Sequence, residues 1–184
     1  MMAMRWAGII VASLSLGTGL AGTAALAQKQ DAVSALKGHD TNAPIDVTSD
    51  RIEVQDRTDR AIFAGNVHVR QADLTMDAER VTVAYSTEGG VQINRIDAAG
   101  GVLVRSPSET ARGAFGIYDT DRKLITLVGN VQLTRGQNQI TGARLVIDLD
   151  SGRAVIDGGP PGVNSSGGRV SGHFTVPQHQ QQQH

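Results

Sequence analysis

The chain has 184 residues and carries 17 basic against 18 acidic side chains, for a formal net charge of −1. That length suits one domain with a sizeable core. With aromatic residues at only 3% and no basic stripe, the composition argues against nucleic-acid binding, which needs cations for phosphates and rings for bases. The absence of cysteine excludes disulfides, thiolate metal sites and a cysteine nucleophile.

The first 27 residues have the pattern of a secretory signal peptide. Arg5 precedes an apolar stretch that begins at Trp6, and Ala25-Leu26-Ala27 supplies a small-residue cleavage site. We therefore predict export to the periplasm with cleavage after Ala27. An uncleaved membrane anchor is the alternative, but the strongly apolar part is short for a hydrocarbon layer of about 30 Å.

Residues 28–43 are polar and weakly periodic, which predicts a flexible lead-in that ends at Pro44. From Ile45 to about Ile156 the chain consists of segments with period-two alternation, rich in Val, Ile and Thr and separated by Gly, Asp-Arg and Ser-Pro turns. No long stretch shows a 3.6-residue period. The pattern predicts an all-β sandwich, barrel or roll of short antiparallel strands.

The alternation changes parity inside residues 63–86. Apolar side chains occupy odd positions up to Val69, even positions from Leu74 to Ala78, and odd positions again from Val81. Because a shift of one residue turns every side chain to the other face, we predict a turn near 71–73 and a bulge or corner near 79–80.

This pattern repeats further along the chain. Residues 125–149 match 63–86 closely: Gly65-Asn66-Val67 aligns with Gly129-Asn130-Val131, and Met76 aligns with Ile140. A weaker copy spans 98–119, where Gly113, Phe115 and Ile117 are taken to continue one alternation. Three such units, none able to bury its apolar face alone, are expected to stack on one another.

The C-terminal part contains a Gly/Pro/Ser loop at 157–168 and a last alternating segment at 169–176, predicted to be a closing or edge strand. We place the domain at 44–177. Residues 178–184 (QHQQQQH) predict a disordered tail. Its histidines lack nearby carboxylates or cysteines and are interpreted as solvated rather than metal-binding.

No constellation of residues indicates chemistry. His68 falls on the polar face without a nucleophile beside it, and most aspartates adjoin turns. We therefore predict no catalytic residue, no metal site and no cofactor. A secreted β-fold carbohydrate-active enzyme with a carboxylate pair stays as a weaker alternative. The repeated apolar face either fills a dry core or lines a groove for an apolar ligand, and composition does not decide between these two.

Residues 44–85 contain in order the segments PIDVTSD, FAGNVHV and AERV, and a second GNV follows at 129–131. These ordered motifs resemble the OstA-like domain of the LptA-like periplasmic lipopolysaccharide-transport proteins. The resemblance covers 44–157 well and 169–177 more loosely.

The resemblance implies a twisted β-jellyroll, open at both ends, that takes the acyl chains of lipopolysaccharide (lipid A) into its interior. It further implies head-to-tail self-association into a bridge between an LptC-like inner-membrane protein and an LptD-like outer-membrane protein. A membrane-anchored LptC-like protein of the same pathway is the alternative within this fold.

Parity and resemblance together give the candidate sites. The predicted interior, lipid-binding residues are Phe63, Val67, Val69, Leu74, Met76, Val81, Val83, Phe115, Ile117, Leu127, Val131, Leu133, Ile140, Leu145 and Ile147. The predicted partner contacts lie on the two edge segments and are Ile45, Val47, Ile52, Val54, Val170, Phe174 and Val176.

Overall fold

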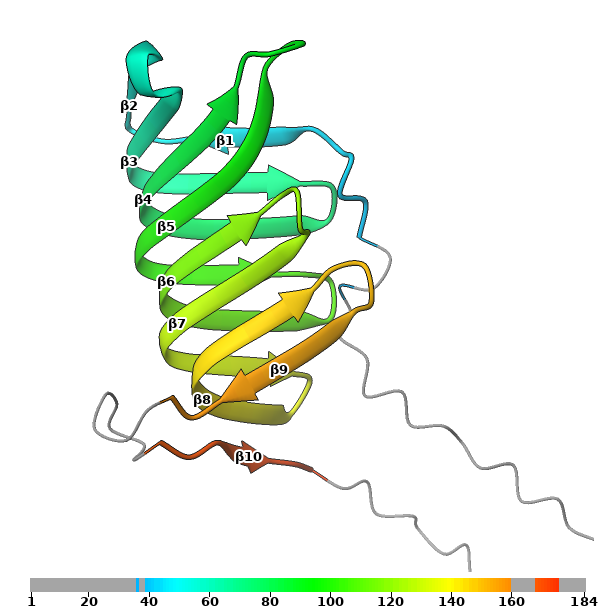
Figure 1. Ribbon diagram of the computed structural model, residues 1–184. Helices are drawn as coiled ribbons and strands as arrows, with labels where there is room; N and C mark the ends of the chain where they lie inside the picture. The colour runs from blue at the N-terminus through cyan, green and yellow to red at the C-terminus, as the bar shows by residue number, and fades with distance from the viewer. Residues whose placement is uncertain (1–35, 37–38, 160–167, 176–184) are drawn as a thin grey trace, which may run out of the picture. The chain divides into compact units, whose positions relative to one another are not determined.

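The computed structural model describes residues 36, 39–159 and 168–175, all within the compact unit Ala32–His184 (Figure 1). The predicted signal peptide, most of the lead-in and the Gln/His tail lie outside the described residues. Among the residues described, no helix is long and apolar enough to cross a membrane.

The fold is one unclosed antiparallel sheet, which confirms the all-β prediction. Its order is β1-β3-β4-β5-β6-β7-β8-β10, with β2 also on β3 and β9 also on β8. The strands are β1 (Ile45–Thr48), β2 (Arg51–Gln55), β3 (Arg60–Gln71), β4 (Leu74–Ser86), β5 (Gln92–Arg105), β6 (Glu109–Asp119), β7 (Leu124–Arg135), β8 (Asn138–Asp148), β9 (Arg153–Asp157) and β10 (Ser171–His173), with a 3-10 turn at Asp56–Thr58.

Three long hairpins, β3–β4, β5–β6 and β7–β8, correspond to the three predicted repeats. Each has a bulge in its first strand, where two residues with positive φ lie opposite one residue of the next strand. These bulges are Gly65-Asn66, Gly100-Gly101 and Gly129-Asn130. Bulges bend a strand and increase its twist, so neighbouring bulges create one corner that runs across the sheet.

The corner divides the sheet into two arms, which fold toward each other with their apolar faces inward (Figure 1). The first arm contains β1, β10 and the strand segments 67–71, 74–78, 102–105, 109–113, 131–135 and 138–142. The second arm contains β2, β9 and the segments 60–64, 80–86, 92–99, 115–119, 124–128 and 144–148.

The first bulge is tied to the link between β1 and β2. The Asp50 amide donates to the Gly65 carbonyl at 2.9 Å, and Asn66 Nδ2 donates to Asp50 Oδ2 at 2.8 Å. A Cβ added at Gly65 would lie 2.5 Å from that carboxylate oxygen. Two motifs that are separate in the sequence, the Ser-Asp start and the Gly-Asn-Val hairpin, therefore form one contact at the corner.

Parity behaves differently in the two strands of each hairpin. A strand that contains the two-residue bulge keeps its parity, whereas the strand opposite changes it, as between the buried Ala78 and Val81 in β4. The flip predicted near 79–80 is thus confirmed, and the matching repeat has its own flip at 142–144. In β6 the flip falls between Gly113 and Gly116, both buried.

The predicted interior position of Phe115 is wrong. Phe115 is on the outer face with 57% of its surface exposed, while Tyr118 is the ring that lies inside, at 6%. Ile117 is half-buried and borders both the interior and an outer groove. The error arose because the residues flanking the flip are glycines, which have no side chain to indicate a face.

Both predicted edges are edges of the sheet, each built from two short strands. At the N-terminal edge Ile45 and Val47 pack on the core, whereas Ile52 and Val54 are exposed. At the C-terminal edge Val170 and Phe174 are exposed and Val176 lies outside the described residues. The strand β9 also lies on this edge, where Val155 is exposed. From the sequence alone, this strand was not placed at an edge.

Candidate functional site

The space between the arms contains most of the predicted lipid-binding residues. Buried there are Val67, Val69, Leu74, Val81, Val83, Leu127, Val131, Leu145 and Ile147. Phe63, Met76 and Leu133 are half-buried and pack against this cluster, and Ile140 is also half-buried. The alternation of apolar positions therefore predicted the inner face of both arms correctly, except in strand β6.

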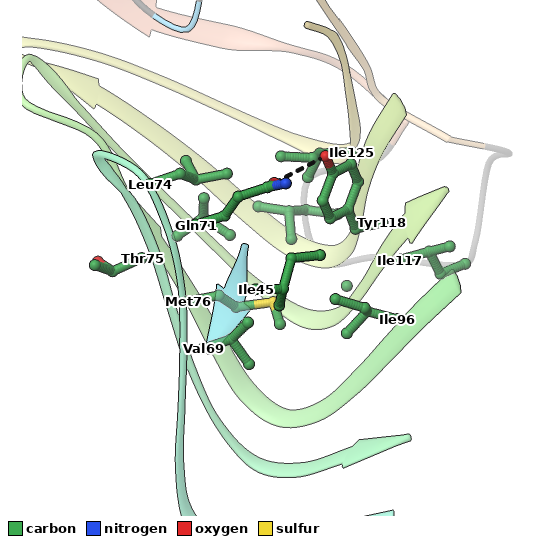
Figure 2. Close-up of a pocket in the computed structure, with 13 residues that line it drawn as sticks. Ile45, Val69, Gln71, Leu74, Thr75, Met76, Ile96, Ile117, Tyr118 and Ile125 are labelled. Atoms are coloured by element: carbon green, nitrogen blue, oxygen red, sulfur yellow. Dashed lines mark hydrogen bonds between the residues drawn. The ribbon is translucent and has the colours of Figure 1, made fainter. Parts of the chain in front are cut away.

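A cavity of about 30 Å³ lies between the arms and is almost wholly apolar (Figure 2). Its first-arm side consists of Ile45, Val69, Gln71, Leu74, Thr75, Met76 and Val104, and its second-arm side of Ile96, Gly116, Ile117, Tyr118, Ile125 and Leu127. It has room for about two water molecules, because side chains from both arms occupy most of the space.

Gln71 connects the arms at the open side of the cavity. Its Nε2 donates to the carbonyls of Thr41 and Ala43, each at 3.0 Å. Its Oε1 accepts from the Tyr118 hydroxyl at 3.0 Å (Figure 2) and lies 3.2 Å from His39 Nε2. Gln71 is only 4% exposed, so these partners satisfy an amide that would otherwise be buried at a large cost.

Sequence reasoning did not identify Gln71 or Tyr118. The available signal was that Gln71 continues the odd positions of Val67 and Val69, so that a polar residue stands on an apolar face. Burial raises the pKa of the Tyr118 hydroxyl, and its hydrogen bond to Gln71 lowers it by less. The hydroxyl therefore stays protonated and remains a donor to the Gln71 carbonyl oxygen.

The described part of the lead-in packs against this open side. Leu36 is 3% exposed and lies beside Val104, Ala111, Leu133 and Ile147, around a smaller space of about 10 Å³. His39 Nδ1 lies 2.9 Å from Asp73 Oδ1 in the β3–β4 turn. Where the structure describes it, the segment predicted to be flexible is fixed to the interior.

Residues 46–153 match the family described as LptA/(LptD N-terminal domain) LPS transport protein. The chain belongs to this family. An uncharacterised protein of Rhizobium meliloti is 34% identical over 167 residues, which cover 87% of this chain and 86% of that protein.

The fold is also similar to a solved structure, LptH of Pseudomonas aeruginosa, described as the LptA-homologous periplasmic component of the lipopolysaccharide transport device. The TM-score is 0.66 at 17% identity, over 75% of this chain and 99% of LptH. Membership of the LptA/LptD N-terminal family places the protein in lipopolysaccharide transport. LptA homologues are periplasmic, and the family consists of transport proteins rather than enzymes.

In this LptA-like chain the outer faces of the two arms carry different chemistry. On the second arm, Phe115 and Ile117 border an open groove together with Arg80 and Asp97. On the first arm, Asp77 pairs with His68 at 2.6 Å and with Arg105. Partial burial acts to raise the pKa of Asp77, but hydrogen bonds and charge from His68 and Arg105 bring it below its usual value.

Proposed function

We propose that this LptA-like protein carries lipopolysaccharide through the periplasm and shields the lipid A acyl chains between its two arms. The observation that supports this most directly is the apolar cavity enclosed by the arms of an unclosed sheet. Each buried methylene is worth about 0.8 kcal/mol, so an acyl chain needs continuous apolar cover to cross an aqueous compartment.

Binding requires the arms to separate, because the cavity has room for only about two water molecules. No strand pairing among the described residues joins the arms across the open side. The corner bulges, with their consecutive positive-φ residues, are the natural hinge between the two arms.

Photo-crosslinking tests the lipid site. A photoreactive residue at Met76 or Ile140, which are half-buried on the inner face, should capture lipopolysaccharide. The matched controls are His68 and Gln132. Each directly precedes the residue that pairs with Met76 or Ile140 and therefore has the opposite parity. Equal capture at both sets of positions would contradict the proposal, as would failure of residues 28–184 to co-purify with lipopolysaccharide.

The proposed bridge forms by head-to-tail stacking of copies through their edges. The exposed side chains of Ile52 and Val54 at one edge, and of Val170 and Phe174 at the other, support this, since unpaired edges can add a strand from another chain. Such a contact does not close, so it extends to LptC-like and LptD-like partners. A chain truncated before Arg169 should lose the oligomers in solution, and their persistence would refute this arrangement.

The proposal includes export and cleavage after Ala27. Sequencing the N-terminus of the protein recovered from the periplasm tests this directly. A mature chain that begins at Gln28 supports a soluble carrier, whereas an intact apolar segment retained in the inner membrane supports the LptC-like alternative.

A further inference from the structure

The described lead-in residues, 36 and 39–43, form a strap over the open side of the interior. Leu36 places an apolar side chain against Val104 and Leu133, at 3% exposure. Through Pro44 the strap continues into β1, whose Ile45 lines the main cavity. The strap therefore lies over part of the open side between the arms.

The strap presents two kinds of group to the interior. One is the branched aliphatic side chain of Leu36, and the other is the pair of backbone carbonyls, from Thr41 and Ala43, that accept from Gln71 Nε2 at 3.0 Å. An ester- or amide-linked acyl chain offers the same combination, because a hydrocarbon is joined directly to a carbonyl acceptor. An acylated ligand can therefore replace both the apolar contact and the hydrogen bonds that hold the strap.

We propose that the strap is a displaceable self-ligand, and that an acylated amphiphile replaces Leu36 in the interior and the strap carbonyls on Gln71. Gln71 and Tyr118 then form the polar end of the acyl-chain site. This inference rests on the proposed function, because it describes how the lipid-binding interior is closed when no lipid is bound.

Burial of Gln71 explains why displacement depends on a ligand. A buried amide that loses its acceptors is destabilising, whereas exchange of one carbonyl for another is nearly neutral. Tyr118 donates to the other end of the same amide, from the opposite arm. The strap is therefore retained until another carbonyl and another apolar group take its place.

The test uses the absence of cysteine from the chain. Leu36→Cys introduces a single thiol at a 3% exposed position, whose reaction with a maleimide reports opening of the strap. With purified lipopolysaccharide at saturation, we expect labelling to accelerate by about tenfold or more. The polysaccharide part without acyl chains should leave the rate unchanged. The matched control is Val81→Cys, at 0% exposure beside the corner, whose labelling should stay slow throughout.

A second variant separates the strap from the cavity. In the Leu36→Cys background, Gln71→Met keeps the length of the side chain but removes its amide, so labelling without lipid should rise by about tenfold. Should that protein fail to melt cooperatively, Gln71→Glu replaces it, because a carboxylate cannot donate to the strap carbonyls.

Three outcomes are decisive. Faster labelling of the Leu36→Cys thiol, both with lipopolysaccharide and in the Gln71 variant, supports the self-ligand. An unchanged rate while lipopolysaccharide co-sediments with the protein overturns the self-ligand and leaves the carrier function standing. Failure of lipopolysaccharide to bind at all overturns the carrier function, and the self-ligand with it.

Discussion

The inner faces of the two arms carry side chains that are buried to different depths. Away from the corner, Met76 and Leu133 of the first arm are half-buried, whereas Ile96 and Ile147 of the second arm are each 1% exposed. Tightly packed side chains contribute most to stability, and incompletely covered ones are available to a ligand. The comparison indicates that the fully buried pair mainly stabilises the fold and that the half-buried pair is available to a ligand.

The outer faces differ as well. The first arm carries an ion-paired cluster around Asp77, while the second arm exposes Phe115 at 57%, Val128 at 40% and Val155 at 41%. An apolar side chain on a strand is therefore not enough to identify the interior of this fold. The deciding factor is which side the other arm covers.

The largest expected effect distinguishes the two faces of the second arm. Leu127→Ala removes a fully buried side chain and should lower the free energy of unfolding by about 2–5 kcal/mol. Phe115→Ala, on the outer face, should change it by no more than about 0.5 kcal/mol. Urea denaturation of both variants measures the difference. Equal losses would contradict the corrected orientation of β6.

The next effect concerns the corner that separates the arms. Gly129 has a φ of 86°, and a Cβ there would lie 2.9 Å from Ala114 Cβ. Gly129→Ala should therefore destabilise the protein by about 1–3 kcal/mol through backbone strain and crowding. Gly136→Ala is the matched control, because that turn glycine also has positive φ but no neighbour within 4 Å. A smaller loss at Gly129 than at Gly136 would refute the crowded corner.

Half-buried and fully buried inner positions should differ in how they affect stability and lipid binding. Met76→Ala on the first arm should weaken lipopolysaccharide binding by about tenfold, since it removes apolar contact area from the cavity lining. Ile147→Val on the second arm removes one methyl group from a fully buried position, so it should lower stability by about 0.5–1.5 kcal/mol and weaken binding by less than Met76→Ala does. Binding isotherms and denaturation curves on both variants measure this. If Ile147→Val weakens binding as much as Met76→Ala does, the division of roles is wrong.

The smallest effect is the pH dependence of the ion-paired cluster on the first arm. Because the pKa of Asp77 is lowered in the folded state, its contribution to stability is present above the unfolded pKa of about 3.9. That contribution is lost as the pH falls through the lowered folded value. The side chain is 37% exposed, so the effect should stay below about 1 kcal/mol.

Asp77→Asn is the variant that tests it. The difference in urea midpoint between the wild-type protein and this variant should be present above about pH 5 and should shrink below about pH 4. A difference that does not shrink below about pH 4 would show that Asp77 is not held in its ionised form.

Much of the fold could be predicted because strand alternation is a local property. The three repeats, the turn near 71–73 and the flips opposite Gly65-Asn66 and Gly129-Asn130 were all visible as changes of parity. The third flip could not be seen, since Gly113 and Gly116 have no side chains. The same omission placed Phe115 inside and left Tyr118 unnoticed.

The candidate site was predicted only in part. Residues with consistent parity, such as Val69 and Leu127, do lie between the arms. Gln71 and Leu36 were missed because their roles depend on contacts between distant segments: Gln71 reaches Thr41, Ala43 and Tyr118. Nothing in a polar, weakly periodic stretch indicates that its single leucine will be buried.

The sequence by itself determined which residues form strands, where the strands bend and which family the chain resembles, because alternation and Gly-Asn bulges act through the local backbone. Only the tertiary structure decided which face of each strand is covered, and that Ile45 lines the cavity rather than only an edge. It also decided that the described lead-in residues, 36 and 39–43, pack against the open side. Burial depends on what the opposite arm and the strap place over a residue, and no local pattern contains that information.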